Sequence, residues 1–141
     1  MASSADPLLL DTSAAVLLAD PRSAFRPWLV ETIGDRSVGL AGHATYEVLS
    51  VLTRLPAPRR LSVAEAGQFI AENFPHPHFL DAATSATLVE EFARLGVTGG
   101  AIFDGLVGAA ARDADLELLS CDQRAATTDT LLRVRAVLPR A

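Results

Sequence analysis

The stretch Leu8-Leu9-Leu10-Asp11-Thr12-Ser13 is an uninterrupted apolar run that ends abruptly in one carboxylate and two hydroxyls. A continuous apolar run predicts a strand that is buried on both faces, as in a parallel sheet. Residues 13–18 then predict a helix, with Thr12 or Ser13 as its N-cap. We therefore expect Asp11 at the carboxyl end of a first, central strand, which is the edge where open α/β sheets bind ligands.

Strand and helix patterns alternate along the rest of the chain. Apolar segments predict further strands at 36–42, 116–121 and 134–138, with a weaker candidate at 77–81. Helical spacing of apolar residues predicts helices at 25–34, 43–55, 62–75, 84–96, 101–113 and 122–132. Short alternation of this kind implies parallel strands joined by right-handed crossovers. The sequence thus predicts one α/β domain over residues 1–141, a three-layer α/β/α sandwich with a four- or five-stranded parallel sheet.

Local signals mark where two of these helices begin. Ser62 and Glu65 match a capping box at the start of the helix over 62–75. Thr84 or Ser85 is the expected cap of the helix that follows, and Gly96 is its expected stop.

Composition narrows the possible functions. All twelve basic residues are arginine, so the chain lacks the lysine that a P-loop or Schiff-base chemistry requires. The single cysteine, Cys121, excludes an internal disulfide framework and a cysteine zinc cluster. The net charge of −5 disfavours a protein that coats nucleic acid, although it is compatible with an acidic metal pocket. No apolar run reaches the length of a membrane span and no signal peptide is evident, so we expect a cytoplasmic protein without membrane association.

Four acids stand out because their neighbours in the sequence are apolar: Asp11, Glu47, Asp104 and Asp122. Two follow predicted strands and two lie on predicted helices, so all four can meet at one edge of the sheet. Such a cluster would repel itself unless it held a hard divalent cation, and Mg²⁺ or Mn²⁺ prefers oxygen ligands. Each acid also has a structural explanation, as a helix cap, a first-turn acid or a solvated helix residue.

Four segments in this order resemble the motifs of PIN domains, and in particular those of the VapC toxins of bacterial VapBC toxin–antitoxin modules. The segments are Leu10–Ala14, Tyr46–Leu55, Ile102–Ala111 and Leu119–Ala125. Their order, their spacing and the chain length all fit that family, and the likeness extends over nearly the whole chain.

The resemblance implies a PIN-like fold and a metal-dependent ribonuclease that acts as a toxin. It assigns Asp11, Glu47, Asp104 and Asp122 as catalytic residues and as ligands of Mg²⁺ or Mn²⁺. Thr12, Ser13 and Ser120 match positions whose hydroxyls support the carboxylates in the family. The family usually carries a small residue after the third acid. The glycine at this position, Gly105, is a minor departure, because its conformational freedom is expected to loosen the start of that helix. RNA as substrate, a VapB-like antitoxin and a homodimer are further implications.

Arginines in predicted loops are candidates for contact with RNA phosphate. Arg124 is better placed than Arg59 or Arg60, because it lies two residues after Asp122.

Two other functional classes fit parts of the pattern. A haloacid-dehalogenase-like phosphatase or a receiver domain also places an aspartate after its first strand. Both depend on a lysine, and the dehalogenase pattern requires a second aspartate where Ser13 stands. A catalytically silent PIN-like interaction module is the other alternative, and carboxylate-dependent binding of Mn²⁺ would distinguish it from a nuclease.

Overall fold

A computed structural model describes residues 6–140 and is organised around a parallel sheet with the strand order β2-β1-β3-β4. The strands are β1 (Leu8–Leu10), β2 (Val38–Leu40), β3 (Leu118–Leu119) and β4 (Ala136–Val137). Every neighbouring pair is parallel, with Leu9 opposite both Gly39 and Leu118. The predicted parallel sheet of four or five strands is therefore confirmed, with four strands, and so is the central position of its first strand.

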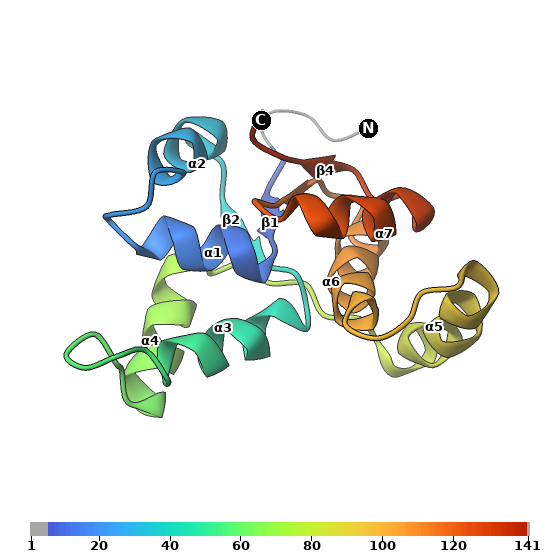
Figure 1. Cartoon of the computed structure of the whole chain (residues 1–141), viewed down its shortest axis with the longest axis horizontal. Coiled ribbons are helices and arrows are strands. Elements are labelled where there is room, and N and C mark those ends of the chain that lie inside the picture. The colour runs from blue at the N-terminus through green and yellow to red at the C-terminus, as the bar shows by residue number, and fades with distance from the viewer. Residues whose placement is uncertain (1–5, 141) are drawn as a thin grey trace.

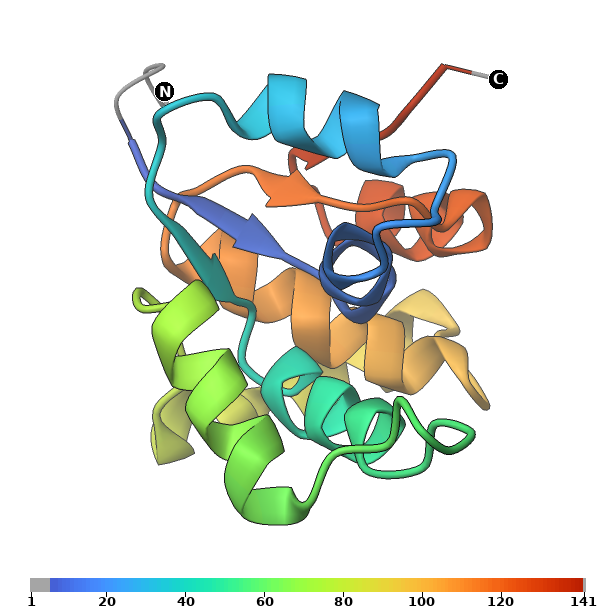
Figure 2. The same ribbon diagram turned by 90° about the vertical axis from the view of Figure 1, so that its left-hand side faces the viewer.

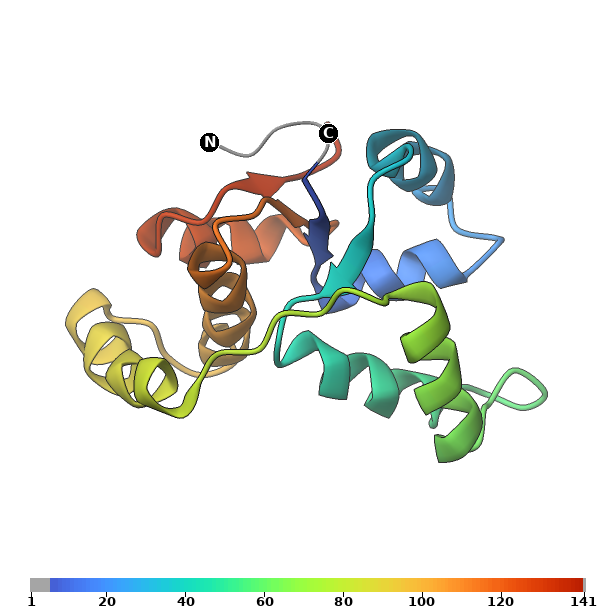
Figure 3. The same cartoon turned by 180° about the vertical axis from the view of Figure 1, so that it is seen from behind.

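The helices form two groups on either side of the sheet (Figure 1). The first group is α1 (Thr12–Ala19), α2 (Arg26–Ile33), α3 (Ala44–Leu52) and α4 (Val63–Asn73). The second is α5 (Ala82–Leu95), α6 (Ala101–Asp113) and α7 (Ala126–Leu131), the last preceded by a short 3₁₀ turn, η1 (Gln123–Ala125). The view from behind shows the same division, with the strands between the two groups (Figure 3). The predicted α/β/α layering is confirmed.

Strand β1 is the centre of the core because both of its faces are covered. Leu8 and Leu10 pack into a cluster with residues of α1, α2 and α4, and both are fully buried. Leu9 points to the other face, where it packs with residues of α6 such as Val107 and Ala110. Figure 2 shows α2 and α6 on opposite sides of the strands. This double burial explains why the first apolar run has no alternation of polar residues.

The expected strand at 77–81 is wrong. Residues 75–78 instead lie along β2 as an irregular edge segment that makes only two isolated bridges, Gly39 with Pro75 and Ala41 with His78. Pro75 and Pro77 have no backbone N–H to donate, which prevents a regular ladder there. A Cβ on Gly39 would lie 1.8 Å from the carbonyl oxygen of His76, so this edge segment requires glycine in β2.

The predicted capping box at α4 is confirmed. The Ser62 hydroxyl accepts from the Glu65 amide at 3.1 Å, and the Glu65 carboxylate accepts from the Ser62 amide at 2.9 Å. The expected cap of α5 is wrong, because Asp81 occupies that position in place of Thr84 or Ser85 and accepts from the Thr84 amide at 2.7 Å. Helix α5 therefore begins earlier than predicted, and it ends at Gly96 as expected.

Between residues 6 and 140, none of the helices combines the length and the apolar character needed to cross a bilayer.

Candidate acidic active site

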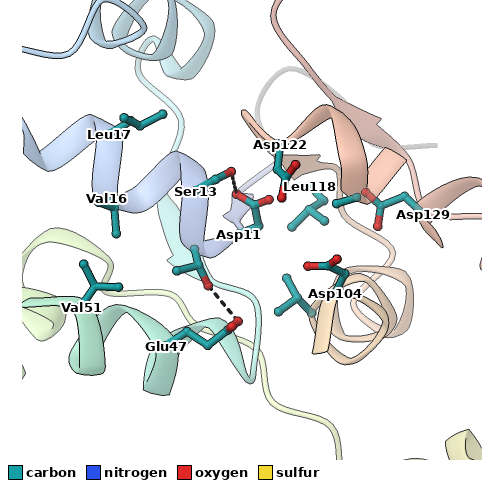
Figure 4. Close-up of a pocket in the computed structure, with 13 residues that line it drawn as sticks. Asp11, Ser13, Val16, Leu17, Glu47, Val51, Asp104, Leu118, Asp122 and Asp129 are labelled. Atoms are coloured by element: carbon teal, nitrogen blue, oxygen red, sulfur yellow. Dashed lines mark hydrogen bonds between the residues drawn. The ribbon is translucent and has the colours of Figure 1, made fainter. Parts of the chain in front are cut away.

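A pocket of about 350 Å³ opens at the carboxyl edge of the sheet, and five carboxylates line it (Figure 4). They are Asp11, Glu47, Asp104, Asp122 and Asp129. Asp11 follows β1, Asp122 follows β3, and the other three lie on α3, α6 and α7. The structure thus brings together all four acids singled out in the sequence, from elements far apart along the chain, and adds one that was not.

Asp11 is held in one orientation by three hydrogen bonds. Its Oδ1 accepts from the Ser13 hydroxyl at 2.7 Å and from the Ala14 amide at 2.9 Å, and its Oδ2 accepts from the Ser120 hydroxyl at 2.5 Å. The bond from Ala14 makes Asp11 the N-cap of α1, so the expectation that Thr12 or Ser13 caps this helix is wrong. Burial raises the pKa of Asp11, and the three hydrogen bonds oppose that rise.

The hydroxyls of Ser13 and Ser120 also tie the ends of β1 and β3 together. Ser13 Oγ accepts from the Cys121 amide at 3.0 Å, and Ser120 Oγ accepts from the Asp122 amide at 3.1 Å. Each hydroxyl therefore donates to Asp11 and accepts from the backbone that leads to Asp122. Their side chains fix the relative position of the two strand-end aspartates.

Glu47 lies in the first turn of α3 and points across the pocket toward Asp11 (Figure 4). The Thr12 hydroxyl donates to Glu47 Oε1 at 2.9 Å. Thr12, Ser13 and Ser120 are thus all hydrogen-bonded to acids of the pocket, as the proposed supporting role of these hydroxyls requires.

Asp104 lies in the first turn of α6, where the helix dipole favours an acid. Burial raises its pKa, and the charges of Asp122, Glu47 and Asp11 raise it further, whereas Arg124 lowers it. The neighbouring Gly105 is buried, and a Cβ there would lie 2.8 Å from the Phe92 ring. The missing side chain therefore lets α5 pack closely on α6 beside the pocket.

Asp122 caps η1, because its Oδ1 accepts from the Arg124 amide at 2.9 Å. The Arg124 guanidinium lies 3.4 Å from the same oxygen, and its side chain is 93% exposed. Arg124 is therefore free to reach a ligand above the pocket. Arg59 instead pairs with Asp20 at 4.0 Å, and Arg60 donates to the Leu55 carbonyl at 2.9 Å.

Asp129 was missed because its neighbours in the sequence are polar. Its spacing does carry a signal: it lies four residues after Ala125 and three before Leu132, both of which are buried. An acid between two buried positions at helical spacing lies on the buried face of its helix. The structure places it there, only 3% exposed.

The donor chemistry of the pocket fits a hard divalent cation. Carboxylate oxygens are the ligands that Mg²⁺ and Mn²⁺ prefer, and the like charges that raise the pKa of Asp104 are those a cation would neutralise. Within residues 6–140, no three His, Cys, Asp or Glu side chains are grouped closely enough to form a ready metal cage. Mg²⁺ commonly keeps several waters and binds through one or two carboxylates, so a lined pocket suits it without such a cage.

Comparison with known proteins gives two relatives over most of the chain. The chain is 36% identical over 132 residues to Ribonuclease VapC27 of Mycobacterium tuberculosis (strain ATCC 25618 / H37Rv). This alignment covers 94% of this chain and 96% of the relative. The chain is 40% identical over 105 residues to Ribonuclease VapC40 of the same species (strains CDC 1551 / Oshkosh and ATCC 25618 / H37Rv), covering 74% of this chain and 78% of the relative. No protein-family model matches the chain.

Proposed function

This chain belongs to the VapC family of PIN-domain ribonucleases, and from that membership we propose that it is a metal-dependent ribonuclease toxin of a type II toxin–antitoxin module. Its site is the acidic pocket, where Asp11, Glu47, Asp104 and Asp122 hold Mg²⁺ or Mn²⁺ and RNA phosphodiester bonds are hydrolysed. The observation that carries the proposal is the convergence of these four acids, from separate elements, on one pocket.

Asp11 is the best-oriented acid of the four. Three hydrogen bonds hold its carboxylate against the cost of burial, so it can act as a fixed anionic ligand. Thr12 orients Glu47 in the same way from the neighbouring position. A bound divalent ion supplies Lewis-acid stabilisation of the phosphoryl oxygen and lowers the pKa of an attacking water.

Asp104 and Arg124 have complementary roles. Burial and the charges of the other acids raise the pKa of Asp104, so a bound cation would favour its ionised form and make it a ligand on the α6 side of the pocket. Arg124 pairs with Asp122 of the pocket and has an exposed guanidinium, which can bind a phosphate of the RNA backbone. The net charge of −5 leaves phosphate binding to such local arginines and to the metal.

The partners implied by the family are proposals for this chain. We propose a VapB-like antitoxin, whose binding over the acidic pocket would block RNA access, and a homodimer as the working unit. Helix α4 is one candidate contact, since Val63 at its start is 65% exposed. Light scattering on the purified protein, alone and with its antitoxin, measures both states, and we expect the cytoplasm to be where they act.

Growth arrest on induced expression tests the proposed function. The wild type is compared with Asp11→Asn and Asp104→Asn, and cleaved RNA ends are mapped in the same cells. Asparagine is as good an N-cap as aspartate, so Asp11→Asn preserves the start of α1 while it removes a negative ligand. Asp20→Asn is the matched control, because Asp20 lies at the other end of α1.

We expect the wild type and Asp20→Asn to arrest growth and to cleave RNA at specific sites. The two pocket variants should do neither. Arrest that survives both pocket substitutions would remove the acidic pocket from the mechanism. A folded wild type that neither cleaves RNA nor binds Mn²⁺ would favour the silent interaction module.

A further inference from the structure

The Asp129 carboxylate is buried in the pocket wall without a hydrogen-bond partner. The residue is 3% exposed, and neither of its carboxylate oxygens has a partner among the described residues. Buried polar groups are normally satisfied, because an unpaired one loses its hydration and gains nothing in return. An ionised carboxylate in this position is especially costly. Asp129 therefore requires an explanation that the packing of α7 does not supply.

The structure leaves room for this carboxylate. A Cβ on Gly108 of α6 would lie 2.9 Å from Asp129 Oδ1 and 3.0 Å from a methyl group of Val134. Only a residue without a side chain at this point of α6 allows α7 to bring a carboxylate so close. Neither Gly108 nor the apolar Val134 has a side chain that can donate a hydrogen bond to the carboxylate. A partner for its oxygens would therefore have to bind in the pocket that Asp129 lines.

Asp129 points into the pocket from the side opposite Asp11 and Glu47, and Asp104 and Asp122 line the same pocket (Figure 4). Burial, together with the charges of Asp11, Asp104 and Asp122, raises its pKa to about 7. The charges that act on Asp129 are thus those of three acids of the proposed metal site. A divalent cation between these acids would offset the repulsion and give the free oxygens a partner.

We propose that Asp129 is a fifth carboxylate of the pocket that holds divalent cations, an inference that rests on the proposed metal-dependent function. Its place opposite Asp11 adds α7 to the strand ends and the helices α3 and α6 that already supply carboxylates. Binding through Asp129 takes place directly or through one of the waters that Mg²⁺ and Mn²⁺ retain. The carboxylate is therefore kept at a cost to the metal-free fold and is used when the cation binds.

Titration of the full chain with Mn²⁺, followed by calorimetry and by the electron paramagnetic resonance signal of free Mn²⁺, tests this inference. The variants are Asp129→Asn, Asp129→Ala and Asp104→Asn. The matched control is Asp35→Asn, which removes one negative charge from an exposed turn before β2, at the opposite edge of the sheet. Melting temperatures are recorded for each protein with EDTA and with saturating Mn²⁺.

We expect Asp129→Asn to weaken Mn²⁺ binding about 10-fold or more. The same variant should melt at a higher temperature than the wild type without metal, and should gain less from Mn²⁺. Asp35→Asn should match the wild type in both respects. A residue with a purely structural role would not change metal affinity and metal-free stability in opposite directions.

Two kinds of failure are distinguishable. A wild type that does not bind Mn²⁺ overturns the proposed metal-dependent function, and this inference with it. Wild-type binding that is lost in Asp104→Asn but unchanged in Asp129→Asn overturns only the role of Asp129. Failure of both Asp129 variants to fold would show that the carboxylate stabilises the metal-free protein, which also contradicts the inference.

Discussion

Ser120 Oγ donates a hydrogen bond to Asp11 Oδ2 over 2.5 Å, and this contact joins residues 109 positions apart at the ends of two neighbouring strands. Ser120 is fully buried and Asp11 is 8% exposed, so the bond is shielded from water. A hydrogen bond to the charged form favours ionisation, and here it opposes the rise in pKa that burial causes. The serine hydroxyl thus helps to keep Asp11 anionic and in one orientation.

Ser120→Ala should therefore weaken the site without removing any of its acids. With that hydrogen bond gone, the pKa of Asp11 rises further, so Mn²⁺ affinity falls by about 10- to 100-fold and the acid limb of the pH–rate profile moves to higher pH. Calorimetry and RNA cleavage between pH 5 and 8 measure the two effects. Ser85→Ala, at an exposed position in α5, is the control. An unshifted acid limb in Ser120→Ala would contradict this role for the hydroxyl.

Asp129 should make the metal-free protein less stable as the pH rises. Its pKa is about 7 in the folded chain against 3.8 for an unperturbed aspartate, so the folded state binds more protons than the unfolded state between these two values. Its contribution to the free energy of unfolding is fully present below about pH 4 and is lost as the pH rises through about 7.

Urea denaturation in EDTA, at several values of pH from 4 to 8, measures this contribution as the difference between the wild type and Asp129→Asn. We expect the variant to gain stability relative to the wild type with increasing pH. Subtraction removes the effects of acids with lowered pKa values, such as Glu91 and Asp81, which have the opposite pH dependence. A difference that does not change with pH would be incompatible with a buried, unpaired carboxylate.

The sequence predicts those parts of the fold and site that local patterns encode. The run Leu8–Leu10 encodes a doubly buried strand, and Ser62 with Glu65 encodes a capping box, because each depends on neighbours in the chain. The convergence of the four acids followed from the rule that parallel strands end at one edge. The repulsion within the cluster suggested a divalent cation, and the family resemblance assigned the four acids as its ligands.

Other features depend on tertiary contacts that no local pattern carries. The carboxylate of Asp129 lies against Gly108, which belongs to α6, and neither Gly108 nor the nearby Val134 has a side chain that can donate a hydrogen bond to it. Residues 75–78 follow the edge of β2 because two prolines prevent regular pairing and Gly39 lets the chain approach. The short segment 77–81 was apolar enough to suggest a strand, yet of its residues only His78 forms a bridge, with Ala41 directly after β2.

Gly39→Ala should strongly destabilise the protein. The added Cβ would meet the His76 carbonyl oxygen at 1.8 Å, a backbone clash that no rotamer change relieves, and we expect a loss of more than about 3 kcal/mol of unfolding free energy. Gly67→Ala is the matched control in α4, where a Cβ meets nothing within 4 Å. That substitution should stabilise the protein by about 0.5–1 kcal/mol. Equal unfolding midpoints in urea for the two variants would show that residues 75–78 do not hold their position against β2.

Arg124→Ala should weaken RNA binding while leaving the metal site intact. The side chain is 93% exposed and pairs with Asp122 at 3.4 Å, so its loss removes a phosphate contact beside the pocket without disturbing the core. Arg22→Ala is a close control, because Arg22 pairs with Asp20 through the same spacing and a similar distance of 3.5 Å. We expect only Arg124→Ala to lower the affinity for single-stranded RNA and to reduce the slope of its salt dependence by about 1.

Binding of RNA is measured by fluorescence anisotropy at several salt concentrations, with every variant made in the Asp11→Asn background to prevent cleavage. If both arginine variants bound RNA equally well, phosphate recognition would have to lie elsewhere, whereas a loss of Mn²⁺ affinity in Arg124→Ala would place the arginine in the support of Asp122.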